Sequence, residues 1–317
     1  MRWLAIALML GLAAPLPAAA QKLPARAQHA VDPALPAGGI SFFPDSQRAP
    51  VSYQTVKGRV IFRAKIGNRE VWALLDNGAD RTLIDLKTAQ AAGFKLDSRT
   101  TPVFGAGGGS LASQWVEDVP ISIEGQFRAR MPMLGLDMRA ASKILGYPIE
   151  LVLGADALMH MALRVDPFAR TFHLTPTGKM DGIAASEAIA LSGKRALVEI
   201  RIGGKAALVG IDLGSNGGLA LSHAAWRRMG ATGTHLGTGS ATGATGMSYD
   251  VEVFEVPEMD IGRLTVSKVH ASLENPRPGV GDGIIGMAIL GQFVIVIDLG
   301  AGKLWLIAPP RIEATFD

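Results

Sequence analysis

The chain contains an internal repeat, and this repeat constrains the fold more than any other feature of the sequence. Residues 65–79, "KIGNREVWALLDNGA", align without a gap with residues 201–215, "RIGGKAALVGIDLGS". Asp76 then lies over Asp212, an offset of 136 residues. Self-similarity at a fixed offset predicts that one structural unit occurs twice in the chain.

Three later blocks repeat in the same order, which indicates that a whole domain has been duplicated. The glycine-rich residues 104–110, "FGAGGGS", correspond to 237–246, "GTGSATGATG", with Gly107 over Gly243 at the same offset. The remaining blocks pair 151–158 with 283–290, and 163–174 with 294–306.

Both copies have the pattern of β-structure. Their apolar runs are short, rich in β-branched residues and bounded by Gly, Pro or Asp, as is typical of strands. Short helices are expected at 85–94 and 222–230, each with a glycine near its end. We therefore predict an all-β protein with two similar lobes, 53–178 and 179–317, and few short helices. The strand-like runs are "GRVIFRAKIG", "REVWALL", "VEDVPISIEG", "ALVEIRIGG", "DVEVFEV" and "FVIVIDL".

The N-terminus predicts export. Residues 1–20, "MRWLAIALMLGLAAPLPAAA", combine an early Arg2, an apolar stretch and small residues, which is typical of a cleaved signal peptide. A membrane anchor is the alternative, but the stretch is short and contains Pro15 and Pro17. We expect a periplasmic or secreted bacterial protein with no stable membrane anchor after cleavage.

The segment that follows, residues 21–52, is rich in Ala, Pro and Gln. Its spaced prolines exclude a regular helix or a central strand. We predict a linker or an N-terminal extension, and a pro-segment is a further alternative.

Composition excludes several classes of function. With 48% apolar and 19% charged residues the chain is globular, and a net charge of +3 without a basic stripe gives no case for nucleic acid. The absence of cysteine excludes disulfides, thiol catalysis, a lipoprotein anchor and Cys-ligated zinc. The six histidines show no ligand spacing and no Gly-x-Ser-x-Gly elbow occurs, so we expect neither a metal centre nor a serine nucleophile.

Asp76 ends an apolar run and opens an Asp-Asn-Gly turn within residues 71–85, "VWALLDNGADRTLID". Taken alone, this pattern is typical of a surface hairpin turn. The match to Asp212 adds a second hypothesis, in which the two aspartates act as a pair.

The repeated segments resemble the active-site loop of retropepsins, the aspartic proteases of retroviruses and their bacterial relatives, whose motif is Asp-Thr/Ser-Gly-Ala/Ser after an apolar strand. The stretch "FGAGGG" resembles the family's flap, and "LVLGAD" and "GIIGMA" resemble the segments that support the loop. The resemblance covers nearly all of 53–310, twice. It implies two β-barrel lobes in one chain, a monomer with an internal pseudo-dimer, and no cofactor.

The resemblance implies that Asp76 and Asp212 form a catalytic pair, one from each lobe. Two carboxylates held close share one proton. The ionised member can take a proton from a water that attacks a peptide carbonyl, while the protonated member donates toward the carbonyl oxygen. A peptide or protein would be the substrate.

Further roles follow from the same resemblance. Gly78 and Gly214 would let two backbones approach closely, since glycine has no Cβ, and Ser215 could hydrogen-bond Asp212. The loop-supporting set is Asn77, Gly78, Ala79, Leu213, Gly214 and Ser215. The substrate-binding set is Asp80, Gly105, Gly107, Gly108, Asn216, Gly239 and Gly243.

Two other features have simpler interpretations. The glycine-rich residues 105–109 could suggest a phosphate loop, but Lys-Ser/Thr does not follow them and there is no βαβ pattern. A flap or a flexible loop fits the flanking strands better. Asp166 and Asp298 each end a strand before turn residues, so we predict that they stabilise turns.

The second motif position departs from the family pattern. Its usual Thr or Ser hydroxyl bonds to the backbone of the opposite lobe, but this chain has Asn77 and Leu213. An Asn side chain can donate and accept hydrogen bonds, and a Leu side chain can do neither. Two functions therefore stay open: an aspartic endopeptidase, or a non-catalytic module that binds a peptide or protein on the same scaffold.

Overall fold

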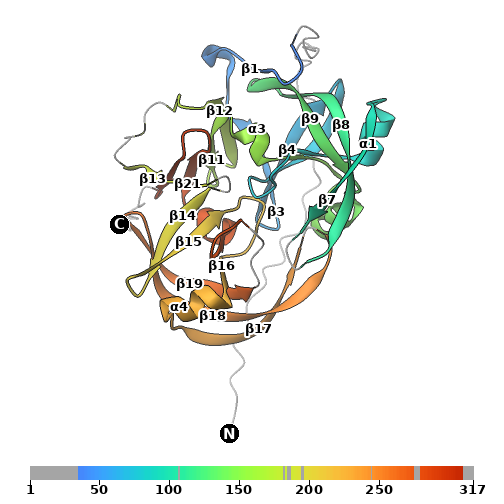
Figure 1. Cartoon of the computed structure of the whole chain (residues 1–317). Coiled ribbons are helices and arrows are strands. Elements are labelled where there is room, and N and C mark those ends of the chain that lie inside the picture. Colours follow the sequence, from blue (N-terminus) through green and yellow to red (C-terminus); the bar gives the residue numbers. More distant parts are fainter. Residues whose placement is uncertain are drawn as a thin grey trace, which may run out of the picture. The chain divides into compact units, whose positions relative to one another are not determined.

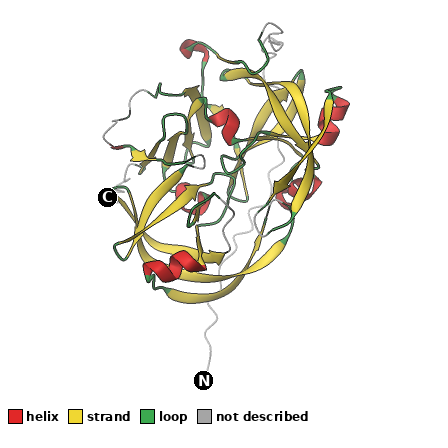
Figure 2. Cartoon of the chain, in the orientation of Figure 1, coloured by secondary structure: helices red, strands yellow, loops and turns green. Residues whose placement is uncertain are grey.

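The computed structural model consists mostly of strands, with few and short helices (Figures 1 and 2). The prediction of an all-β protein with few short helices is confirmed. All described residues belong to one compact unit. The structure describes residues 35–105, 108–180, 183, 187–193, 196–243, 245–274 and 279–309.

Six strands of the first lobe close into a ring. The lobe contains β3 (Gln54–Val56), β4 (Arg59–Ile66), β5 (Arg69–Leu75), β6 (Leu83–Asp85), β7 (Leu96–Phe104), β8 (Ser110–Ile123), β9 (Phe127–Leu136) and β10 (Ile149–Leu153). Neighbours follow the order β4-β5-β10-β6-β9-β8, and β8 also pairs with β4 to complete the ring. Strands β5 and β10 run parallel, as do β6 and β9, and the other neighbours are antiparallel. A ring of this kind has no free sheet edge.

The second lobe repeats this ring. It contains β14 (Leu197–Ile202), β15 (Lys205–Ile211), β16 (Leu219–Ser222), β17 (Thr234–Thr242), β18 (Ser248–Ile261), β19 (Leu264–Glu274) and β20 (Gly283–Ile285). The order is β14-β15-β20-β16-β19-β18, closed by a pairing of β14 with β18. The parallel pairs are again the equivalent ones, β15 with β20 and β16 with β19. Two rings with the same order and the same strand directions confirm the internal duplication.

The two glycine-rich hairpins align differently from the sequence comparison. Strand β7 ends at Phe104 and β17 ends at Thr242, so the strands place Gly105 over Gly243, an offset of 138. The sequence match of Gly107 with Gly243 was therefore wrong by two residues. Two extra residues in the second lobe account for the difference. One lies before β16, and the other lies in the helix after β16, which is seven residues long, whereas the equivalent helix of the first lobe has six. Gly107 itself lies outside the described residues.

A six-stranded sheet joins the two lobes. Its strands are β2 (Val51–Ser52), β11 (Met161–Asp166), β12 (Thr171–Pro176), β13 (Ile189–Ala190), β21 (Val294–Asp298) and β22 (Lys303–Ile307). The order is β13-β22-β21-β11-β12-β2, so each copy supplies three strands that mirror the other three. At the centre, β11 of the first copy pairs antiparallel with β21 of the second. The lobes are thus joined by backbone hydrogen bonds as well as by the chain.

The described part of the N-terminal extension is held on the first lobe. Strand β1 (Ile40–Phe42) pairs with β9, and β2 pairs with β12, each at the edge of its sheet. Gln126 fixes the segment between them, because its amide nitrogen donates to Ala49 O at 2.5 Å and its oxygen accepts from Leu174 N at 2.8 Å. The predicted signal peptide and residues 21–34 lie outside the described part. Within that part, no helix is long and apolar enough to cross a bilayer.

The two predicted helices are present. Helix α1 (Leu86–Ala91) begins at the N-cap Asp85, whose carboxylate accepts from Thr88 N, and α4 (His223–Met229) begins at the N-cap Ser222. Helix α4 ends at Gly230 in the left-handed conformation. The sequence did not predict three other helices, α2 (Arg139–Leu145), α3 (Ala155–Leu158) and α5 (Met287–Leu290), or the 3-10 turn Asp45–Gln47.

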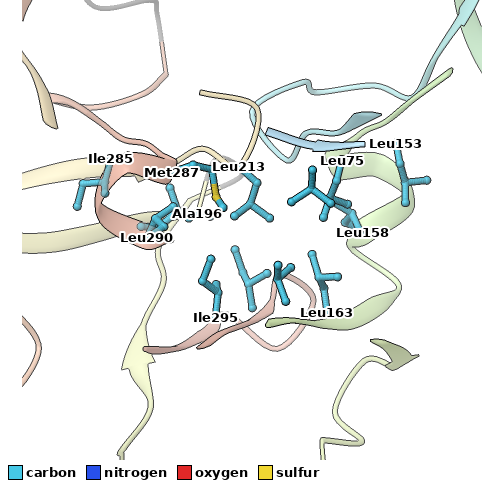
Figure 3. Close-up of a cluster of buried hydrophobic side chains, with 14 of the residues drawn as sticks. Leu75, Leu153, Leu158, Leu163, Ala196, Leu213, Ile285, Met287, Leu290 and Ile295 are labelled. Carbon is cyan, nitrogen blue, oxygen red and sulfur yellow. The ribbon is translucent and has the colours of Figure 1, made fainter. Parts of the chain in front are cut away.

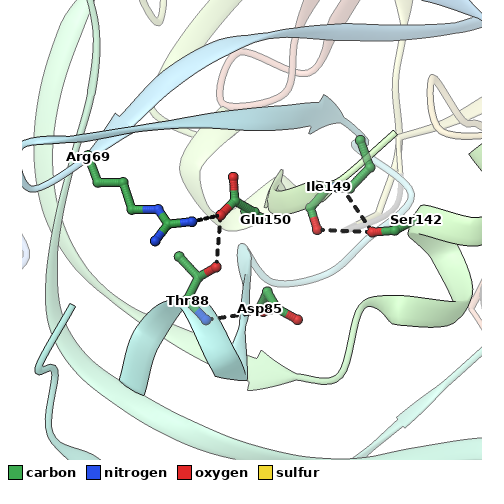
Figure 4. A network of polar contacts seen from close by, with 6 residues as sticks. All are labelled: Arg69, Asp85, Thr88, Ser142, Ile149 and Glu150. Atoms are coloured by element: carbon green, nitrogen blue, oxygen red, sulfur yellow. Dashed lines mark hydrogen bonds and ion pairs between the residues drawn. The ribbon is translucent and has the colours of Figure 1, made fainter. Parts of the chain in front are cut away.

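A polar network ties α1 to the neighbouring strands (Figure 4). Glu150 on β10 accepts from Arg69 of β5 at 2.5 Å and from Thr88 Oγ1 of α1 at 3.0 Å. Ser142 of α2 in turn accepts from Ile149 N at 3.0 Å. These bonds fix the position of β10, which supports the loop that carries Asp76.

The main hydrophobic core runs through both lobes and the sheet that joins them. Leu213, with no exposed surface, lies in it beside Leu75 of the first lobe and Met287 of the second (Figure 3). Burying a leucine contributes about 1.5–3 kcal/mol to folding. Leu213 therefore serves the packing between the lobes.

Candidate functional site

The loops after β5 and β15 are supported in the same way. Asp76 N donates to Leu153 O at 3.1 Å, and Ala155 N donates to Ala79 O at 2.8 Å. In the second lobe the equivalent bonds run from Asp212 N to Ile285 O at 3.0 Å and from Met287 N to Ser215 O at 2.8 Å. Each loop is thus held between the end of its own apolar strand and the segment that follows β10 or β20.

Backbone hydrogen bonds orient both carboxylates. Asp76 Oδ1 accepts from Gly78 N at 2.9 Å and from Ala79 N at 3.2 Å. Asp212 Oδ1 accepts from Gly214 N at 2.9 Å and from Ser215 N at 3.0 Å. Such charge-assisted bonds fix the direction of a carboxylate.

Each carboxylate lies against the glycine of the opposite loop. A Cβ placed on Gly78 would be 2.6 Å from the carboxylate atoms of Asp212, and a Cβ on Gly214 would be 2.3 Å from Cγ of Asp76. No side chain fits at these distances. The structure therefore brings Asp76 and Asp212 together at the contact between the lobes, and glycine makes their approach possible.

Gly214→Ala is expected to displace the Asp76 carboxylate and to destabilise the protein by about 1–3 kcal/mol, the usual cost of overpacking. The matched control is Gly217→Ala, three residues along the same loop, where the new Cβ would lie 3.6 Å from Ser215 Oγ, an ordinary contact. Thermal unfolding compares the two variants. Equal melting temperatures would contradict the close approach of the loops.

One side chain joins the two loops. Asn77 is 5% exposed; its Nδ2 donates to Ile211 O at 2.7 Å and its Oδ1 accepts from Leu213 N at 2.8 Å. Both partners belong to the second lobe, and the Leu213 side chain lies in the core. The single amide of Asn77 therefore makes two contacts between the lobes, one as donor and one as acceptor, and it uses the backbone of Leu213 rather than its side chain.

A sequence profile described as aspartyl protease matches residues 62–157 and again residues 198–289, together more than half of the chain. The chain belongs to the aspartyl protease family. Each match falls on one of the two rings and contains one of the paired aspartates, so each lobe is one copy of the family's domain. No curated protein matches the sequence.

Arg59 is a further residue beside the paired aspartates of this member of the aspartyl protease family. Its Nε donates to Gly214 O at 2.6 Å, which ties β4 of the first lobe to the loop of the second. Burial lowers the pKa of Arg59, and the negative charges of Asp76 and Asp212 partly oppose this. In the sequence, Arg59 and Arg195 are separated by the same 136 residues as Asp76 and Asp212, and Arg195 lies outside the described residues.

The residues expected to bind substrate fall in two places. Asp80 and Asn216 are exposed near the loops, and Asn216 lies close to the turn before β4, because a Cβ on Gly58 would be 3.2 Å from its Cβ. The Ser215 hydroxyl accepts from Gly217 N at 3.3 Å. Gly239 lies within β17 opposite Val251, three residues before the end of the strand.

The tips of the two glycine-rich hairpins meet (Figure 1). Thr245 Oγ1 of the second lobe donates to Gly108 O of the first at 3.2 Å. A Cβ on Gly105 would be 2.7 Å from Cγ2 of Thr245, so the two hairpins approach closely here. Gly243 lies at the start of the second tip, and its N donates to Met247 O. Gly105 and Gly108 lie between β7 and β8, which pair as an antiparallel hairpin.

Asp166 and Asp298 stabilise turns, as predicted. Asp166 Oδ1 accepts from Phe168 N at 3.0 Å and from Ala169 N at 2.9 Å. The buried Asp298 accepts from Thr177 Oγ1, Gly178 N and Ala301 N. In the described part of the chain, no three His, Asp or Glu side chains are grouped as a metal site would require.

Proposed function

We propose that this protein is an aspartic endopeptidase in which Asp76 and Asp212 activate a water molecule for attack on a peptide bond held between the lobes. The observation that carries the proposal is the reciprocal packing of the loops, with Gly78 against Asp212 and Gly214 against Asp76. Membership of the aspartyl protease family supports the same chemistry.

The reaction needs only the two carboxyl groups and water. The ionised member takes a proton from the water as its oxygen attacks the carbonyl carbon, and the protonated member donates to the carbonyl oxygen. The tetrahedral intermediate then breaks at the C–N bond, a proton passes to the leaving nitrogen, and the pair again holds one proton. Which aspartate begins ionised is a property of the coupled pair.

Three contacts would keep the pair aligned during this reaction. Backbone N–H groups hold one oxygen of each carboxylate, Asn77 fixes one loop to the other, and Arg59 bonds the loop of Asp212. Catalytic groups must be held to within about 0.5 Å of their productive geometry. The hairpin tips, which touch each other, would have to part to admit a peptide.

The second candidate is a non-catalytic module that binds a peptide or protein. It is favoured by the loss of both hydroxyls at positions 77 and 213, which family members use to join the loops. The double hydrogen bond of Asn77 offsets that loss, so we place the endopeptidase first.

The experiment that tests the proposal is cleavage of a diverse peptide library by the wild-type protein, followed by mass spectrometry at several pH values from acidic to neutral. Direct attack by water predicts one ¹⁸O in the new carboxylate when the reaction is run in labelled water, and no hydroxamate when hydroxylamine is present, since no acyl-enzyme forms. Binding without cleavage by the folded protein would establish the second candidate. Hydroxamate products would overturn the mechanism.

A further inference from the structure

The first lobe presents an apolar surface next to the Asp76 loop. Ala79 of that loop packs with a second hydrophobic cluster, which includes residues of β6, β9 and β10 and the pair Val103–Leu111 near the tip of the β7–β8 hairpin. We call six members of this cluster the lobe-1 wall: Ala79, Leu83, Val103, Leu111, Leu136 and Val152. An apolar wall beside the reacting carboxylate would accept an apolar side chain of a substrate.

Strand registers identify the equivalent wall of the second lobe. Leu136 pairs with Asp85, the N-cap of α1, and Glu274 pairs with Ser222, the N-cap of α4. The other strands follow the same correspondence, since Val152 pairs with Leu83 as Ile284 pairs with Ala220. We call the resulting set the lobe-2 wall: Ser215, Ala220, Ala241, Tyr249, Glu274 and Ile284.

The lobe-2 wall differs from the lobe-1 wall in chemistry. Leu136 is buried among apolar residues, whereas Glu274, at the equivalent place, is only partly buried. Tyr249 Oη donates to Glu274 Oε2 at 2.9 Å, and Ser272 Oγ donates to Glu274 Oε1 at 2.7 Å. These two hydroxyls orient the carboxylate without neutralising it, and none of the ion pairs among the described residues includes Glu274.

We propose that Glu274 binds a Lys or Arg side chain of the substrate on one side of the scissile bond, while the lobe-1 wall binds an apolar side chain on the other side. This inference rests on the proposed function, because it assigns substrate residues to the two halves of the same site. A cation that reaches a partly desolvated carboxylate forms a charge-assisted hydrogen bond, and an uncharged isostere leaves that carboxylate unpaired.

The first test measures binding without turnover. Two peptides, identical except for Lys or Gln next to an apolar residue, are titrated into the Asp76→Asn protein by fluorescence anisotropy. We expect the Lys peptide to bind about 10–100-fold more tightly, as a hydrogen bond to a charged group predicts. Glu274→Gln in the same background should remove the preference, because the amide has no charge. Its oxygen can accept from one of the two hydroxyls, and its NH2 group can donate to the oxygen of the other. The matched control, Glu252→Gln on neighbouring β18, should retain it.

The second test profiles cleavage sites of the wild-type protein and of Glu274→Gln in the peptide library. We expect sites with Lys or Arg on one side of the cut and an apolar residue on the other, and loss of the basic residue in Glu274→Gln alone. A Lys preference in binding without any cleavage would support this subsite and reject the endopeptidase. Cleavage without a basic preference, or equal or absent binding of the two peptides, would overturn the role of Glu274.

Discussion

Replacing either Asp76 or Asp212 by asparagine is expected to lower kcat/KM for peptide cleavage by about 10²–10⁴-fold, the range in which general acid–base catalysis contributes. An asparagine oxygen can still accept from the two backbone N–H groups that orient each carboxylate. The side chain keeps its shape but can neither take a proton from water nor share one with its partner. Activity should therefore fall in both variants while the melting temperature changes little.

The chain offers a matched control for this pair. Asp166 accepts from the backbone N–H groups two and three residues ahead, as Asp76 does, but it is the last residue of β11, before the turn to β12. Asp166→Asn should therefore keep full activity. Cleavage that survives in Asp76→Asn or Asp212→Asn would show that the pair is not the catalytic group.

Asn77→Ala is expected to lower the free energy of unfolding by about 2–6 kcal/mol and to reduce cleavage as well. The substitution removes both hydrogen bonds of the buried amide and leaves Ile211 O and Leu213 N without their partner. Each buried group left unpaired costs about 1–3 kcal/mol. Denaturant unfolding gives the stability, and the peptide assay gives the effect on alignment.

A second variant separates the donor bond from the acceptor bond. Asn77→Asp keeps the oxygen that accepts from Leu213 N but replaces the donor to Ile211 O by a second oxygen. The folded state then disfavours the ionised form of the introduced carboxyl, so its folded pKa is raised above the unfolded one. The stability deficit relative to wild type should be largest above the folded pKa and should shrink as pH falls toward the unfolded value of about 3.9. A deficit that does not change with pH would contradict the donor role of Asn77.

Sequence predicted the parts of this fold that depend on local pattern. The gapless match through Asp76 and Asp212 holds because β5 and β15 have the same length and the same turn before them. The predicted alignment of the two glycine-rich hairpins was wrong because the second lobe has two single-residue insertions, one before β16 and one in α4. An alignment of glycine-rich sequences does not locate such insertions. Helix α2 has no counterpart among the described residues of the second lobe, so comparison of the two copies could not predict it.

Contacts between the lobes could not be predicted in the same way. The two bonds of Asn77 to the second lobe depend on where Ile211 O and Leu213 N lie in three dimensions. The Leu213 side chain lies in the core and takes no part in them. Arg59 likewise acts on a carbonyl of the opposite lobe, more than a hundred residues along the chain. The difference between Leu136 and Glu274 is visible in the sequence, but only the strand registers show that the two positions are equivalent.

The pairing of β11 with β21 has a consequence for how such a site can change through mutation. In a symmetric dimer of identical chains every substitution occurs twice, so a change that suits one half is imposed on the other. Here both halves belong to one gene product and are joined by a shared sheet. Asn77 can therefore supply both bonds while Leu213 becomes part of the core, and each half of the site can specialise separately.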